Sequence, residues 1–264
     1  MFRQESASLT GDASSLTVAP LEHGYLNEVL RVTSADGSQS CVVKVFLPYA
    51  KFAGPSIPLE PERCRRQHDA SEYMRSLVAD CCETPLFCDD VNNILCLKDF
   101  PEHKIWREDL MTSCNLQLGG KLVDALVRLH SQSHVTRLGQ AGFAQLKEKF
   151  SLLPKLTEFQ HRYTFVLPFQ ANHRDNKPCD EKVREKIDEV IQDAVVIKAM
   201  QLAEEWLLQD NATCLIHGDL HCGAVLGKSS GQDVKASEIQ RGRGEGGGGR
   251  RVTEREREEG ERAR

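Results

Sequence analysis

Hydrophobic and polar residues alternate differently in the two halves of the chain. Residues 26–33 (LNEVLRVT) and 40–47 (SCVVKVFL) are rich in β-branched residues, and Asp36-Gly37 lies between them. Two such runs joined by an Asp-Gly pair predict an antiparallel hairpin. Residues 92–100 (NNILCLKDF) predict a further strand.

Helical spacing dominates the later part of the chain. A stretch without helix breakers follows Pro61 and predicts a helix that runs to about residue 80. The segments 116–130 and 181–209 carry apolar residues at intervals of three and four, which predicts amphipathic helices. Short apolar pieces at 214–226 indicate a return to strand. The pattern predicts an α+β fold with a small antiparallel-sheet lobe and a mainly helical lobe.

Composition narrows the class of protein. The chain has 264 residues, a formal net charge of −5 and 28% charged residues. This balance argues against a surface dedicated to nucleic acid or anionic membrane. We find neither an apolar run of about 20 residues nor a signal-peptide pattern at the start, so we expect a cytoplasmic protein.

The ten cysteines are scattered and form no CxxC pair. In a chain of this size, which can bury a core without disulfides, they are expected to be reduced thiols. Zinc binding by Cys81, Cys82 and Cys88 is disfavoured because they lack the paired spacing of structural zinc sites.

The two ends differ from the rest. Residues 1–20 are small and polar, which predicts a weakly ordered start. Residues 240–264 are almost entirely Gly, Arg and Glu and cannot bury enough apolar surface to order themselves, so a disordered tail is expected. RNA binding by this tail is an alternative, but six glutamates offset its eight arginines.

The segment 214–230 (CLIHGDLHCGAVLGKSS) concentrates candidate chemistry. Asp219 in a loop beside a glycine can act as a base that accepts a hydroxyl proton. Zinc binding by His217 and His221 is an alternative, although that spacing brings two imidazoles together only on a helix. Buried structural histidines are a third possibility.

Phosphoryl transfer requires further parts: a glycine-bearing hairpin over the phosphates, a strand lysine, a base and magnesium ligands. Gly24 stands at the start of the predicted hairpin, and Lys44 is a lone charge in an apolar strand. Together with Asp219 they supply the first three parts.

Several motifs resemble one family. HGDLHCG (217–223) is similar to the catalytic loop of the aminoglycoside-phosphotransferase and choline-kinase group, which shares the protein-kinase-like fold. HGYLNEVLRV (23–32), the stretch 41–63 and LKDFPEHKIWR (97–107) resemble the methylthioribose kinase branch in particular, and 156–175 keeps a weaker echo. The resemblance covers about residues 21–235.

This resemblance implies a role for each matching residue. Asp219 would be the base for a sugar's C1 hydroxyl, and ATP with Mg²⁺ would be the cofactors. The nucleotide would contact the glycine loop, the strand lysine and the hinge: Gly24, Asn27, Lys44, Lys98, Asp99 and Phe100. The family implies a sugar substrate and a homodimer. Residues 21–103 would form the nucleotide-binding lobe and 104–239 a partial helical lobe.

The chain departs from the family pattern at positions that matter for chemistry. Ala224 stands where the family has Ser. Gln67 takes the place of the carboxylate that pairs with Lys44, and Asp69 or Glu72 are the substitutes nearby.

A third departure concerns the metal. The family's Asp-Pro-Glu carboxylates hold magnesium, whereas here Ala236 replaces the first and only Glu238 aligns with the second. The family's C-terminal part does not follow, so we expect a truncated and weakened kinase. A nucleotide-binding pseudokinase and a kinase for choline, an aminoglycoside or homoserine remain alternatives.

Overall fold

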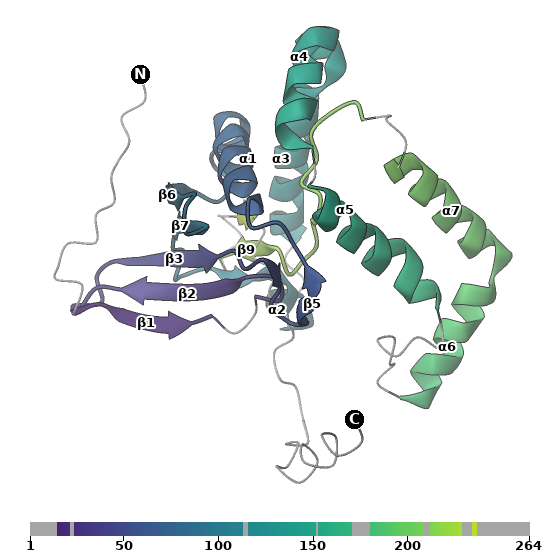
Figure 1. Cartoon of the computed structure of the whole chain (residues 1–264), viewed down its shortest axis with the longest axis horizontal. Coiled ribbons are helices and arrows are strands. Elements are labelled where there is room, and N and C mark those ends of the chain that lie inside the picture. Colours follow the sequence, from purple (N-terminus) through teal and green to yellow (C-terminus); the bar gives the residue numbers. More distant parts are fainter. Residues whose placement is uncertain are drawn as a thin grey trace.

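The computed structural model has the expected α+β arrangement, an antiparallel sheet followed by helices (Figure 1). The predicted fold class is therefore confirmed. The structure describes residues 15–21, 24–112, 116–151, 153–170, 180–208, 212–228 and 234–236. Glu238 and the Gly/Arg/Glu-rich tail lie outside these residues.

A five-stranded antiparallel sheet forms the first lobe, in the order β1-β2-β3-β7-β6. The predicted hairpin and the following strand are its centre, because alternate residues such as Val29, Val42 and Leu95 point into one core. Residues 17–20 form an edge strand, where the sequence predicted a weakly ordered start. The strands are β1 (Thr17–Pro20), β2 (Glu28–Thr33), β3 (Ser40–Val45), β6 (Pro85–Asp89) and β7 (Ile94–Lys98).

Helix α1 (Arg63–Val78) follows a two-stranded ribbon, β4 (Tyr49–Ala50) and β5 (Gly54–Pro58). The helix begins close to Pro61, as predicted. Besides Arg63 at its start, its buried residues recur at intervals of three and four, so they form one face: Cys64, Gln67, Ser71, Met74 and Val78. Two of them are polar, and they carry hydrogen-bonding groups into the interior between the helix and the sheet.

The remaining helices make up the second part of the chain. Helix α3 packs beside α1, and the α5–α7 segment extends away from both (Figure 1). The segment predicted as one helical pattern over 181–209 divides at Asp193, whose ψ of 118° is not helical. The helices are α2 (Trp106–Thr112), α3 (Leu116–Ser133), α4 (Val135–Phe150), α5 (Pro154–His161), η2 (Arg162–Val166), η3 (Leu167–Phe169), α6 (Glu181–Gln192) and α7 (Ala194–Leu208).

Across the described ranges, a membrane-crossing helix is not found, since each helix is too short or too polar to span a bilayer.

A second sheet joins the two parts, in the order β8 (Lys104–Ile105), β9 (Val225–Gly227) and β10 (Val234–Ala236). Val225 and Val234 pack with α1 and α3 in the larger core. The strand expected at 214–216 is absent: Ile216 is exposed, and the Leu215 amide donates to the Ser133 hydroxyl at the end of α3. That anchor positions the loop that follows.

Candidate functional site

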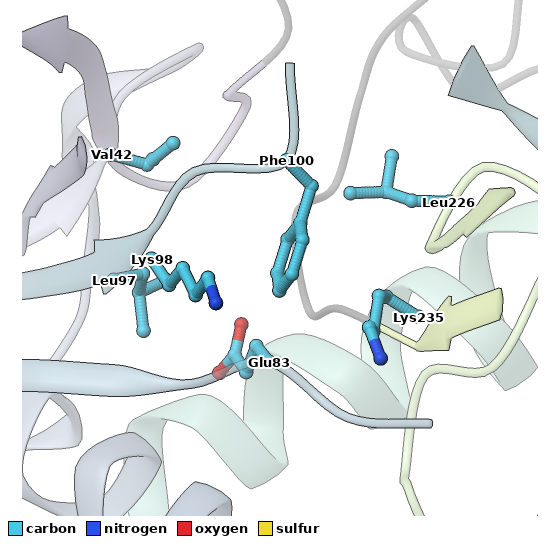
Figure 2. Close-up of a pocket in the computed structure, with 7 residues that line it drawn as sticks. All are labelled: Val42, Glu83, Leu97, Lys98, Phe100, Leu226 and Lys235. Atoms are coloured by element: carbon cyan, nitrogen blue, oxygen red, sulfur yellow. The ribbon is translucent and has the colours of Figure 1, made fainter. Parts of the chain in front are cut away.

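A pocket opens between the five-stranded sheet and the second sheet (Figure 2). It measures about 250 Å³, counting the part open to solvent. Aliphatic side chains line two sides, and Phe100 points into the space between Lys98 and Leu226 (Figure 2). The lining residues are Val42, Glu83, Leu97, Lys98, Phe100, Leu226 and Lys235. The walls therefore combine apolar side chains with the charged groups of Glu83, Lys98 and Lys235.

The segment predicted as the hinge borders this pocket, but its three residues differ in role. Lys98 and Phe100 line the pocket. The Asp99 carboxylate turns away, with its Oδ2 2.7 Å from Nε of Arg31 and accepting from the Ser40 hydroxyl at 2.7 Å. Asp99 therefore fastens the end of β7 to β2 and β3 through its side chain, which leaves only its backbone for a ligand.

Gly24 lies in the loop between β1 and β2, close to the sheet. A Cβ at this position would come within 2.5 Å of the Asn27 carbonyl oxygen and 2.8 Å of Val29, so only glycine fits. The Asn27 side-chain oxygen accepts a hydrogen bond of 2.8 Å from buried Arg63. Burial lowers the pKa of Arg63 to about 10, so the guanidinium is still charged at neutral pH. The loop is thus tied to the start of α1.

Lys44 is almost fully buried on β3, opposite Val29 of the glycine-loop strand. Its ammonium donates to Oε1 of Gln67 at 2.8 Å. Nε2 of Gln67 donates to Oε1 of Glu83 at 2.8 Å, and the Ser71 hydroxyl donates to the same oxygen at 2.6 Å. All four side chains are buried.

The carboxylate connected to Lys44 is therefore Glu83, which the sequence did not indicate. The two substitutes considered from the sequence are wrong. Asp69 lies 3.0 Å from the imidazole of His68, and Glu72 accepts from Arg75, its neighbour on α1. Both point away from the buried face of α1, because they sit at the intervening helical positions.

The loop at 217–221 places Asp219 at the surface of the site. Gly218 has a φ of +86°, which turns the chain sharply, and the Asp219 amide donates to Nδ1 of His217 at 3.4 Å. The Asp219 side chain is 39% exposed, and its Oδ2 lies 3.9 Å from Nε2 of His221. A carboxylate with this exposure can reach a bound hydroxyl.

His217 lies on the inner side of the same loop. Burial lowers the pKa of its imidazole below the ordinary value of 6.5. The charges of Glu83 and Asp219 raise this pKa by smaller amounts, whereas the charge of Lys44 lowers it further. His217 accepts a hydrogen bond from the Asp219 amide, and the charges of Glu83, Asp219 and Lys44 all act on its pKa.

The described residues contain no group of three or more His, Cys, Asp or Glu side chains arranged to hold a metal ion. Ala236, where the family resemblance places a metal carboxylate, brings no oxygen ligand; its amide donates to the Cys81 carbonyl. Every cysteine among the described residues is a free thiol.

Comparisons with known proteins indicate the family of the chain. The model of the phosphotransferase enzyme family matches residues 17–234. A methylthioribose kinase from Cronobacter sakazakii is 24% identical over 239 aligned residues, covering 85% of this chain and 56% of that protein. One from Geobacillus is 27% identical over 217 residues, covering 81% and 53%.

The chain spans about half the length of these curated relatives. Among solved structures, Plasmodium vivax ethanolamine kinase superposes with a TM-score of 0.46 at 14% identity, covering 86% of this chain and 56% of that one.

Proposed function

The chain belongs to the phosphotransferase enzyme family, and on that premise we propose that it transfers the γ-phosphoryl group of ATP to the C1 hydroxyl of 5-methylthioribose. The observation that carries the proposal is the combination of a buried lysine on β3 with a partly exposed carboxylate in the 217–221 loop. Lys44 is 2% exposed, whereas the Asp219 side chain is 39% exposed. The first suits a phosphate, and the second suits an incoming hydroxyl group.

In the proposed reaction each group has one task. Leu97, Phe100 and Leu226 would enclose the base. Lys44 would neutralise charge on the phosphates, where positioning and charge stabilisation account for most of the rate. The substrate oxygen would bond to the γ-phosphorus while the bond to the bridging oxygen breaks. ADP would then leave, and the hydroxyl proton would move to Asp219.

The proposed substrate follows from the relatives. Proteins named methylthioribose kinase match most of this chain, and the 41–63 stretch resembles that branch. Magnesium would enter bound to ATP, because the described residues contain no cluster of three or more potential metal ligands.

A second candidate function is nucleotide binding without turnover. Ala236 favours it, because this position lacks the carboxylate that the family resemblance places there. In that case the pocket and Lys44 would retain ATP, while transfer would be slow or absent.

The test supplies purified chain and MgATP with 5-methylthioribose, choline or an aminoglycoside, and follows ADP release and the phosphorus NMR spectrum of the product. We expect ADP only with methylthioribose, and a phosphate ester at C1. ADP release with choline or the aminoglycoside instead would contradict the proposed substrate. ATP binding without ADP release from any of the three would favour the second candidate.

A further inference from the structure

Lys44 carries a buried charge whose direct partner is neutral. Its ammonium donates to the Gln67 amide oxygen at 2.8 Å, and its side chain is 2% exposed. A buried ammonium is costly unless negative charge and hydrogen-bond acceptors compensate it. An amide oxygen supplies an acceptor but no net charge, so the compensating charge has to lie further along the hydrogen-bond chain.

Glu83 provides that charge, because it is the next group after Gln67 in the hydrogen-bond chain. The amide of Gln67 has a carbonyl that only accepts and an amino group that only donates. Because a carboxylate only accepts, Glu83 requires the amino group of Gln67 to face it, at 2.8 Å. The carbonyl is then turned toward Lys44. In the opposite orientation, the amino group would face the ammonium, donor against donor.

The Glu83 carboxylate is itself held in place. Ser71, one helical turn beyond Gln67 on the buried face of α1, donates to the same oxygen at 2.6 Å. Glu83 stands just before β6 and lines the pocket (Figure 2). The carboxylate thus has a fixed position two hydrogen bonds from the Lys44 ammonium, at the wall of the proposed nucleotide site.

We infer that Glu83 is a positioning residue that acts through Gln67 to aim and charge-balance the Lys44 ammonium for nucleotide phosphates. The inference rests on the proposed function, because it takes Lys44 to bind phosphate. Gln67 and Glu83 together would perform the task that a single carboxylate on α1 would otherwise perform. Glu83 need not touch the nucleotide to do this.

The test compares the affinities of ATP and adenosine, measured by titration calorimetry in the presence of magnesium. Glu83→Gln keeps the shape of the side chain but removes its charge. We expect it to weaken ATP binding by about tenfold or more, equivalent to roughly 1.4 kcal/mol, while adenosine binding stays unchanged because the base does not contact Lys44. A purely structural role would weaken both ligands together.

Exchanging the Gln67 amide and the Glu83 carboxylate is expected to restore ATP binding. In the double variant Gln67→Glu, Glu83→Gln a carboxylate faces Lys44 directly and an amide donates to it, so ATP affinity is expected to return close to that of the wild type. Gln67→Met breaks the relay and should lose ATP affinity as Glu83→Gln does, which decides the matter if Glu83→Gln fails to fold. Glu72→Gln, on the exposed face of α1, is the matched control and should bind both ligands normally.

The outcomes separate the two proposals. If Lys44→Met weakens ATP binding but Glu83→Gln and Gln67→Met do not, the positioning role is overturned and the proposed function survives. If the double variant binds ATP no better than Glu83→Gln, the relay is likewise overturned. If the wild-type chain binds no ATP, both proposals fail.

Discussion

His217 lies two residues before Asp219, and its partly buried imidazole accepts from the Asp219 amide. Burial lowers the pKa of His217 below 6.5, so the folded state holds this imidazole neutral more firmly than the unfolded state does. Protons then bind preferentially to the unfolded chain, which destabilises the fold in acid. The stability that His217 contributes is complete above its unfolded pKa and is lost as the pH falls through the lowered value.

We therefore expect His217→Gln to flatten the acid side of the stability profile. The free energy of unfolding, measured by urea denaturation from pH 8 to pH 5, should fall less steeply below about pH 6.5 in the variant than in the wild type. His221→Gln is the matched control, because that imidazole is 44% exposed and lies in the same loop. Parallel profiles for the wild type and His217→Gln would contradict a buried neutral imidazole.

Single residues differ in how far the sequence indicates their role. Lys44 was recognisable because a lone charge in an apolar strand requires an explanation. Glu83 was not, because it stands in a short connection after two cysteines, where a carboxylate is ordinarily solvated. Its burial depends on how α1 packs against the sheet, and such long-range packing leaves no mark on the local pattern.

At the scale of elements, β9 and α3 meet at very close range. Gly227 on β9 is buried, and a Cβ there would lie 2.6 Å from Cδ1 and 2.9 Å from Cδ2 of Leu118. Leu118 is 0% exposed, so its side chain has no open space to move into. Because residue 227 has no side chain, β9 can lie directly on α3. This packing places Leu226 at the pocket.

Gly227→Ala is accordingly expected to lower the free energy of unfolding by about 1–3 kcal/mol, the usual cost of overpacking a core. Gly120→Ala is the control, since that glycine lies on the exposed side of α3 with no atom within 4 Å of a Cβ. It should raise stability by about 0.4–1 kcal/mol, because alanine restricts the unfolded chain. Thermal or urea unfolding measures both, and equal effects of the two substitutions would refute the close contact.

Periodicity predicted the elements well where the chain is long and regular. The hairpin, the strand at 94–98 and helices α1 and α3 agree with the sequence pattern. It failed where a single residue ends an element: Asp193 accepts from the Val195 amide and begins a second helix, although the apolar spacing continues across it. It also failed at 214–216, where an anchor to Ser133 replaces strand pairing.

At the scale of the whole molecule, the first lobe contacts the second through an aromatic cluster as well as through the short sheet. Its rings belong to the glycine loop, the turn between β4 and β5, and the region of α5 and η2: Tyr25, Phe52, Phe159 and Tyr163. The centroids of Phe159 and Tyr163 lie 4.5 Å apart, and Phe52 lies 5.9 Å from Tyr163. The loop that carries Gly24 is therefore connected to the helical part through Phe52.

The sequence predicted two lobes and a site between them but not this contact. The four aromatic residues come from three separate stretches of the chain that carry the family resemblance, but that resemblance does not indicate that their rings meet. The direction in which α5–α7 leave the core was equally unpredictable, because an amphipathic pattern specifies an apolar face without naming its partner. Family resemblance supplied the roles of the motif residues, and the structure supplied the arrangement around Lys44.

Our central proposal is that Asp219 acts as the base of a phosphoryl transfer. The most direct measurement is the rate of ADP formation from MgATP and 5-methylthioribose by the wild type and by Asp219→Asn, with ATP affinity determined for both. We predict that the substitution leaves ATP affinity unchanged and slows turnover by about 10²–10⁴-fold, the usual contribution of a positioned base. Equal turnover in the two proteins, or no turnover by a wild-type chain that binds ATP, would contradict the claim.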